Sequence, residues 1–364
     1  MELHIPEADL AVRTMPRGSP EHCSAEEAFT TSGGKVALPH RAAWQETQPA
    51  ISSLAVEVRD SIAERTLALF CADRLPSRMF KGFDILRVER FGEFGDQRAA
   101  EGAVRALAAV ISRSRRLVRA RTEVFCRDPE ELLQVGRLLS QQGFARSLAP
   151  RCYERTGLID LHPTLDEISR GLHKTARRHI RAVGKNPVEI RQITDPALAG
   201  RMSALMTDTF ARSGAKPDPR DWGPLIRFSM DHPHLSRLAG LFRTGGGAPA
   251  PDTLLAFVWG AHHGDTAEYV AGASTRAPDV KMPLSYGLMW DLIEWAWRGG
   301  ATWFDLGGIT GGSHGSDDPV GGISDFKRYF RPEVHTVGAE FTLAGSTTLG
   351  ALSRAVERAR HIRG

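Results

Sequence analysis

The sequence predicts an α/β protein of two domains, each with a mixed sheet flanked by helices. Three observations support this prediction. The chain of 364 residues is longer than most single domains. Its content of 41% hydrophobic and 25% charged residues is ordinary for a folded protein with a large core. Short apolar, β-prone runs alternate with amphipathic helical segments along the chain, which is the pattern of α/β layers.

The first forty residues mix Pro, Gly, Ser, Thr and acids without a period, so residues 1–40 are expected to be a disordered tail. In the first domain, expected at 41–160, Ala103, Leu107 and Val110 lie on one face of a helix. The next helix opens with Asp128 as its cap and a Pro and acids in its first turn. The expected elements are strands at 54–58, 66–71, 83–88 and 117–125, and helices at 96–112 and from 128 to 143.

The second domain, expected at 161–364, repeats this alternation. Thr164 and Glu167 form a Thr-x-x-Glu capping box at a helix start, and Gly299 with Gly300 closes an aromatic-rich helix. The expected helices are 164–182, 195–212, 284–298, 323–330 and 347–362, and the expected strands are 188–193, 235–242, 254–262, 268–273, 302–306 and 334–343.

Composition excludes several functional classes. The four cysteines show no CxxC spacing and no Cys/His cluster, so neither a zinc site nor a disulfide framework is expected. No apolar run approaches the length of a membrane helix, and the first ten residues lack the apolar segment of a signal peptide. We therefore expect a cytoplasmic protein without integral membrane association. A net charge of +4 and a pI near 9.0 permit an anionic partner without demanding one.

One segment concentrates positive charge on a single helix face. Its basic residues recur at three- and four-residue spacing, as in Lys174, Arg177, Arg178, Arg181 and Lys185. Like charges this close repel one another unless solvent or a polyanion screens them. Spacing alone leaves two readings open, a solvated surface or a polyanion-binding face.

Three motifs together resemble the FemABX family of aminoacyl-tRNA-dependent peptidyltransferases. The motifs are Lys-x-x-Arg-Arg-x-Ile-Arg at 174–181, Asp-x-Gly-Gly at 305–308 and Gly-Ile-x-x-Phe-Lys-x-x-Phe at 322–330. The resemblance covers roughly residues 50–345 and is stronger after about residue 140. It implies two tandem domains like those of GCN5-related acetyltransferases (GNAT-like domains). It also implies an aminoacyl group passing from tRNA to an amine, with neither metal nor ATP, so no cofactor is expected.

The resemblance also implies roles for particular residues. Lys327 matches the family lysine at the acyl site, where a fixed cation stabilises the negative charge of the transition state. Asp305 is expected to orient the attacking amine, and the basic helix is expected to lie along the tRNA acceptor stem. The expected substrate-binding residues are Phe326, Tyr269, Arg212 and Ser274.

Structural roles remain open for these residues. Lys327 could instead cap a helix or pair with Asp325, and Asp305 could cap the Gly307–Gly308 turn. Tyr269 and Arg212 could likewise serve only the fold.

Two other functions also remain open. One is an acyl-CoA-dependent N-acyltransferase, and the other is a non-catalytic module that binds RNA or a precursor. The Arg243–Ala248 string matches a CoA loop but is expected in a hairpin, not between a strand and a helix. Residues 44–49 carry no Lys where cell-wall members of the family have one. The expected acceptor is therefore the amine of either a cell-wall precursor or a small peptide-like natural product.

Overall fold

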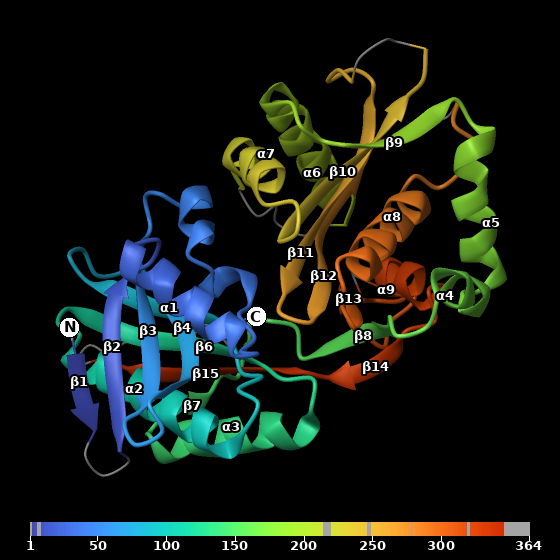
Figure 1. Cartoon of the computed structure of the whole chain (residues 1–364). Coiled ribbons are helices and arrows are strands. Elements are labelled where there is room, and N and C mark those ends of the chain that lie inside the picture. Colours follow the sequence, from blue (N-terminus) through green and yellow to red (C-terminus); the bar gives the residue numbers. More distant parts are fainter. Residues whose placement is uncertain are drawn as a thin grey trace. The chain divides into compact units, whose positions relative to one another are not determined.

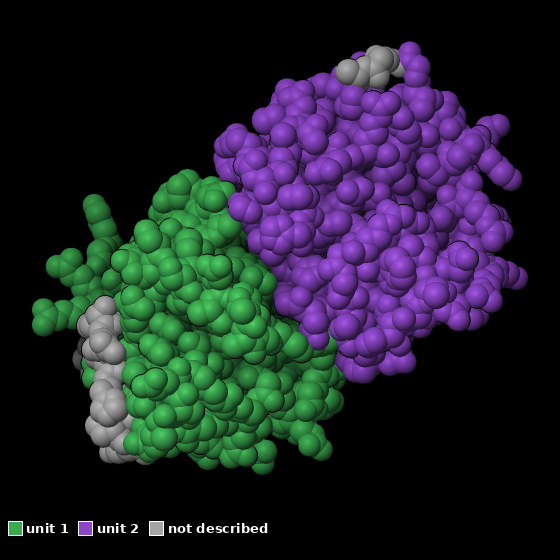
Figure 2. All heavy atoms as spheres, viewed as in Figure 1, with its two compact units in different colours: residues 1–154, 336–364 green, residues 155–335 purple. Residues whose placement is uncertain are grey.

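A computed structural model describes residues 2–5, 9–213, 220–245, 249–277, 279–318 and 321–345. The chain divides into two compact units. Unit 1 contains residues 1–154 and 336–364, and unit 2 contains residues 155–335 (Figure 2). In the part of the chain that is described, no helix is long and apolar enough to cross a membrane.

Unit 1 is built on an eight-stranded sheet with the order β1-β2-β3-β4-β5-β6-β15-β7 among the described residues. Only β5 and β6 pair in parallel, and the other neighbours are antiparallel. The strands are β1 (Glu2–Ile5), β2 (Leu10–Pro16), β3 (Ser52–Asp60), β4 (Arg65–Pro76), β5 (Asp84–Phe91), β6 (Leu117–Phe125), β7 (Ala145–Arg146) and β15 (Gly338–Ala344). The helices are α1 (Pro20–Thr31), α2 (Gln97–Arg113) and α3 (Pro129–Gln141).

Helices cover both faces of this sheet (Figure 1). The apolar side of α2, which includes Ala103 and Leu107, joins Val56, Phe70 and other strand residues in one buried core. A smaller cluster forms where Ala25 of α1 meets Met15, Ala55 and Cys71. Because Ala55 and Cys71 are neighbours in sequence of the core residues Val56 and Phe70, they point to the opposite face of the sheet.

The structure corrects two expectations for unit 1. Residues 1–40 were expected to be disordered, but 10–16 form β2, whose Leu10 and Val12 are buried, and 20–31 form α1. The domain boundary was expected at 160/161, with the second domain running to the end of the chain. Instead the boundary lies at 154/155, and the chain returns to unit 1 through β15. The helix expected at 347–362 falls outside the described residues.

Unit 2 contains a seven-stranded sheet with the order β14-β8-β13-β12-β11-β10-β9 in the described ranges. Strands β12 and β13 pair in parallel, whereas the pairs β8–β13, β12–β11, β11–β10 and β10–β9 are antiparallel. The strands are β8 (Arg155–Asp160), β9 (Val188–Gln192), β10 (Ser236–Arg243), β11 (Leu254–His263), β12 (Thr266–Ser274), β13 (Trp303–Gly308) and β14 (Glu333–Thr336). The helices are α4 (Leu165–Gly171), α5 (Lys174–Ala182), α6 (Ala199–Ser213), α7 (Trp222–Asp231), α8 (Ser285–Arg298) and α9 (Gly321–Arg328).

Helix α8 packs closely on one face of this sheet because β11 has a glycine beneath it. A Cβ atom at Gly260 would lie 2.9 Å from a methyl group of Leu292, so a larger residue there would push α8 outward. On the other face, Trp222 of α7 packs edge-on against Phe257, with 4.9 Å between ring centroids. The sheet is therefore covered on both faces, which fixes its strand ends firmly.

Two expected elements of unit 2 are divided. The helix expected at 164–182 has its predicted capping box at Thr164, but it breaks into α4 and α5 because His173 starts a second helix by accepting a hydrogen bond from Thr175. The strand expected at 334–343 is split between the two sheets as β14 and β15. Gly338 opens β15, and a Cβ there would lie 2.0 Å from the carbonyl oxygen of Tyr153, so only glycine permits this approach.

Candidate active site

The two parallel strands at the centre of unit 2 separate before they end. Thr266 to Glu268 of β12 pair with Trp303 to Asp305 of β13, and Glu268–Asp305 is the last pair. Strand β12 nevertheless continues to Ser274 and β13 to Gly308. The carboxyl ends of neighbouring parallel strands are where α/β folds place ligands, because the opening strands leave backbone groups unpaired there.

The side chain of Lys327 enters this strand divergence from α9. Its Nζ atom donates a hydrogen bond to the carbonyl oxygen of Gly308 at 2.7 Å and lies 5.9 Å from the centre of the Tyr269 ring. The residue is only 5% exposed. Gly307 turns the strand with a φ of +74°, and a Cβ atom there would lie 3.4 Å from Nζ. The expected site residues Lys327, Asp305 and Tyr269 are therefore gathered in one place.

Burial sets the charge behaviour of the lysine. Desolvation lowers the pKa of Lys327 to about 8, and the negative charges of Asp305 and Glu268 act in the opposite direction. The ammonium form therefore predominates at neutral pH. An ammonium in a desolvated position can donate a strong hydrogen bond to an oxyanion, which is the chemistry expected at an acyl-transfer site.

Asp305 has a clear structural role. It is fully buried, and its Oδ1 atom accepts hydrogen bonds from the backbone N–H of Gly307 at 2.7 Å and from the hydroxyl of Thr156. This oxygen thus caps the Gly307–Gly308 turn, which was the alternative reading of the sequence. Thr156, on the neighbouring strand β8, was not singled out because nothing in the local sequence marks it. Its contact arises from the pairing of β8 with β13.

Two further titratable groups adjoin the site, and the sequence analysis did not identify either. Glu268 lies directly opposite Asp305 in the parallel pair, and its Oε2 atom is 3.0 Å from Nε2 of His263. Both residues are buried. The available signal was a carboxylate inside an otherwise apolar strand, one residue before Tyr269. A buried, paired carboxylate of this kind is a candidate site residue.

Phe326, expected to bind substrate, packs among aromatic rings of unit 2. Its ring packs edge-on against Tyr286 at 4.9 Å and against Phe330 at 5.4 Å, so it joins α8 to α9. Asp325 pairs with Arg328, with 2.7 Å between Oδ1 and Nη1, which accounts for the carboxylate that was the alternative partner of Lys327. Helix α9 is therefore anchored by its aromatic residues while Lys327 is directed into the strand divergence.

The other expected substrate-binding residues are less informative. Burial raises the pKa of Tyr269 to about 12, so its hydroxyl stays protonated at neutral pH. Ser274 ends β12, and its backbone exchanges two 3.3 Å hydrogen bonds with the hydroxyl of Thr209 in α6. Arg212 belongs to α6, but its side chain lies outside the described residues.

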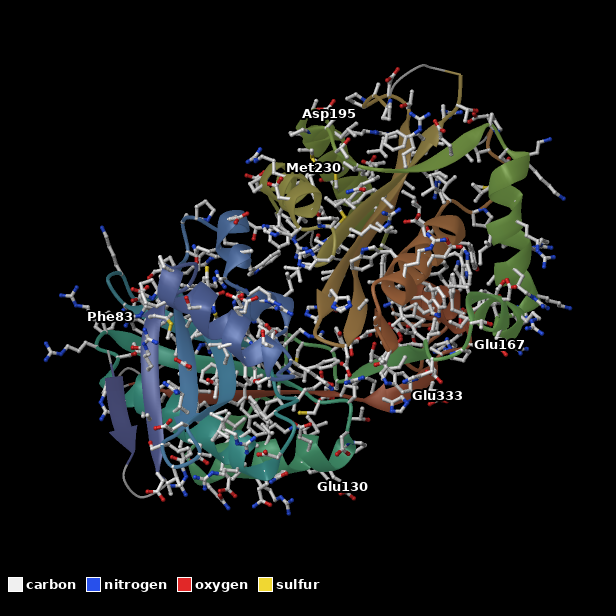
Figure 3. All side chains as sticks on the ribbon, viewed as in Figure 1. Phe83, Glu130, Glu167, Asp195, Met230 and Glu333 are labelled. Carbon is white, nitrogen blue, oxygen red and sulfur yellow. The ribbon has the colours of Figure 1, made fainter. Side chains whose placement is uncertain are left out.

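The basic residues predicted to share a helix face form one surface. All five line a single open hollow of about 470 Å³ together with Ala182, and we call this surface the basic hollow (Lys174, Arg177, Arg178, Arg181 and Lys185). Within the described ranges, none of the five has a carboxylate partner within 4.0 Å. Figure 3 shows nitrogen-tipped side chains projecting from α5. The predicted common face is therefore present, and its positive charge is not neutralised by neighbouring carboxylates.

Two of these five charges lie at the start of the helix, an unfavourable position without an anion, whereas Arg181 lies in the last turn, where the helix dipole favours a cation. Lys174 and Arg177 lie in the first turn of α5, which contains no acidic residue. Unpaired N–H groups give a helix start partial positive charge, so cations there destabilise the helix by typically 0.3–1 kcal/mol each (about the strength of an exposed ion pair). An anion bound at this surface would remove that cost.

Helix α5 is also joined to the helix that carries Lys327. The backbone N–H of His173, at the start of α5, donates to the carbonyl of Tyr329 at 3.1 Å. In the last turn of α5, the His179 ring lies 5.0 Å from the Tyr286 ring, which in turn contacts Phe326. The basic hollow and the strand divergence thus share one packed frame within unit 2.

Comparisons with known proteins identify the fold. Residues 170–328 match the family described as "Acetyltransferase (GNAT) domain". The crystal structure of FemX superimposes with a TM-score of 0.69 at 13% identity, covering 91% of this chain and 97% of that one. No curated protein matches the sequence.

Two further structures superimpose with a TM-score of 0.51. The structure of L-PGS from Bacillus licheniformis is 13% identical and covers 94% of this chain and 98% of that one. A tandem GNAT protein from the clavulanic acid biosynthesis pathway is 12% identical and covers 92% and 99%. The predicted α/β fold of two GNAT-like domains is thereby confirmed, as is the resemblance to FemABX proteins at the level of the fold.

Proposed function

We propose that this chain, which has the tandem acyltransferase fold of FemX, is an aminoacyltransferase that takes its acyl group from aminoacyl-tRNA. The acceptor is a primary amine, on a cell-wall precursor or a small peptide-like natural product. The observation that carries the proposal is the desolvated Lys327 ammonium at the divergence of β12 and β13, in the same unit as a basic hollow without carboxylate partners.

The reaction is the aminolysis of an ester. The nitrogen of the neutral amine attacks the carbonyl carbon that links the amino acid to the terminal ribose, and a C–N bond forms. The C–O bond to the ribose then breaks, the ribose oxygen takes up a proton, and the amine nitrogen loses one. Negative charge develops on the carbonyl oxygen in between, and Lys327 is the donor that would stabilise it, an effect worth on the order of 10²–10³ in rate.

The basic hollow supports an RNA-linked donor. Four cations of α5, together with Lys185 just beyond it, line one hollow and have no carboxylate partners among the described residues, which suits the regularly spaced phosphates of an RNA stem. An acyl-CoA donor, which contains a single nucleotide, needs fewer contacts with cations. The packed frame that links α5 to α9 would hold the RNA and the acyl end in a fixed relation.

The loop where a CoA-dependent enzyme would bind the pyrophosphate supports the same choice. Residues 275–284, between β12 and α8, contain no glycine. Glycines in such loops let the backbone approach a pyrophosphate closely, and their absence prevents that approach. The string that begins at Arg243 lies between β10 and β11, so it does not precede a helix.

The proposal is tested by transfer of a radiolabelled amino acid from charged tRNA to amines in a cell extract, with and without ribonuclease. We expect labelled amide product that requires this protein and disappears after ribonuclease treatment. A product that resists ribonuclease but requires acyl-CoA would overturn the proposal in favour of a CoA-dependent enzyme. Absence of any protein-dependent product from a complete set of charged tRNAs would contradict it as well.

A further inference from the structure

The last pair of the parallel strands places two carboxylates side by side, and the charges of both influence the Lys327 ammonium. Glu268 of β12 and Asp305 of β13 are directly opposite each other, and paired residues in a sheet project to the same face. Both are buried, and both act on the Lys327 ammonium. A buried cation is stable only when counter-charges and hydrogen bonds replace the lost water.

The two carboxylates are held differently. The Oδ1 atom of Asp305 accepts hydrogen bonds from the N–H of Gly307 and from the hydroxyl of Thr156, and these bonds fix the turn. Glu268 is held by His263, whose Nε2 lies 3.0 Å from Oε2. His263 is 5% exposed and ends the neighbouring strand β11, so the contact is shielded from water and persistent.

We infer that Glu268, held by the hydrogen bond from His263, is a counter-ion that acts with Asp305 to keep the Lys327 ammonium charged at the strand divergence. His263 is then a positioning residue that acts through Glu268. For catalysis this inference rests on the proposed function, because only a charged Lys327 can stabilise a developing oxyanion. The charge of Lys327 itself is a property of the protein without substrate.

The other titratable groups around Lys327 do not supply this charge. Tyr269 presents its ring to Nζ, and its hydroxyl is protonated at neutral pH because burial raises its pKa to about 12. On α9 itself, Asp325 and Arg328 pair with each other. Among the residues that the structure describes, Asp305 and Glu268 therefore remain as the anions that act on the ammonium. Of these two, Glu268 is hydrogen-bonded to a titratable side chain, that of His263.

The inference is tested by the NMR titration of lysines labelled with ¹³C at Cε. The chain has seven lysines, and the signal that is missing in Lys327→Arg identifies Lys327. In the wild type, this signal should titrate near pH 8. In Glu268→Gln, the midpoint should fall by about one unit, because an opposing charge is removed. His263→Leu should move it in the same direction, because the carboxylate loses a hydrogen bond that favours its charged form.

Two variants serve as controls. His263→Gln keeps a side-chain N–H that can donate to Glu268, so the midpoint should return towards the wild-type value. His262, the adjacent residue, lies on the other face of β11 with its ring 6.2 Å from Trp295. His262→Leu should leave the midpoint unchanged.

An unchanged midpoint in folded Glu268→Gln would overturn the inference. The role of His263 would be overturned by either of two results. In the first, the Lys327 midpoint shifts in Glu268→Gln but not in His263→Leu. In the second, it shifts equally in His263→Leu and His262→Leu. Because no substrate is present, the titration can support the inference even if transfer from tRNA is never detected, and the two failures are thereby distinguished.

Discussion

Replacing Lys327 with alanine should lower the rate of acyl transfer on the order of 10²–10³-fold, while RNA binding remains close to that of the wild type. The ammonium lies at the strand divergence and not on the basic hollow, so its loss removes a donor to the oxyanion without removing a phosphate contact. Single-turnover transfer at saturating charged tRNA measures the first quantity, and filter binding of the same tRNA measures the second.

A matched control for this variant is Lys81→Ala. Lys81 is an exposed lysine of unit 1, so its removal changes the net charge equally but should affect neither quantity. An equal loss of RNA affinity and rate in Lys327→Ala would make Lys327 a binding residue. A variant as active as the wild type would remove it from the mechanism.

Replacing Arg177, Arg178 and Arg181 together with glutamine should weaken tRNA binding on the order of 100-fold at low salt. The slope of log affinity against log salt concentration should also decrease in magnitude by about three. Each phosphate contact that is lost means that binding releases about one counterion fewer. These arginines line the basic hollow without carboxylate partners in the described part of the chain, so their removal breaks no internal ion pair. The measurement is a series of binding titrations at increasing salt.

A second triple variant separates this effect from net charge. Arg113, Arg115 and Arg116 are exposed residues at the end of α2 in unit 1, and replacing all three with glutamine changes the charge by the same amount. We expect this variant to bind tRNA nearly as the wild type does. If both triple variants lost affinity and salt slope equally, the basic hollow would have no special part in binding.

Local sequence patterns were sufficient for much of the fold. The capping box at Thr164 predicted the start of α4, and the Asp128 cap with its following Pro predicted the start of α3. Helical spacing placed the five basic residues on one face, as the basic hollow shows. These features were predictable because each depends on residues that are close together in the sequence.

The N-terminal region carries the same kinds of local signal. Ser19, Pro20 and Glu21 form the same sequence of cap, Pro and acid that predicted α3, and they open α1. In β2, the buried Leu10 and Val12 alternate with Ala11 and Arg13, which is the period of a strand. The high local content of Pro, Gly and Ser, which is typical of a disordered tail, masks these two signals in the sequence.

Long-range contacts account for the features of the site that local sequence patterns do not predict. The pairing of Glu268 with Asp305 depends on how two strands align in the sheet, and no local pattern specifies that register. The same holds for Thr156, which reaches Asp305 from a strand about 150 residues earlier. The motif around Lys327 identified the lysine, but the groups that determine its charge became visible only in the folded unit.

The most direct test of the account is a crystal structure of the protein with a short RNA stem whose terminal ribose carries an amino acid through a stable amide. We expect the RNA phosphates to contact the basic hollow. We also expect the carbonyl oxygen of the amino acid to lie within hydrogen-bond reach of Lys327 Nζ, beside Gly308. An aminoacyl end bound elsewhere, with Lys327 still donating only to Gly308, would contradict it.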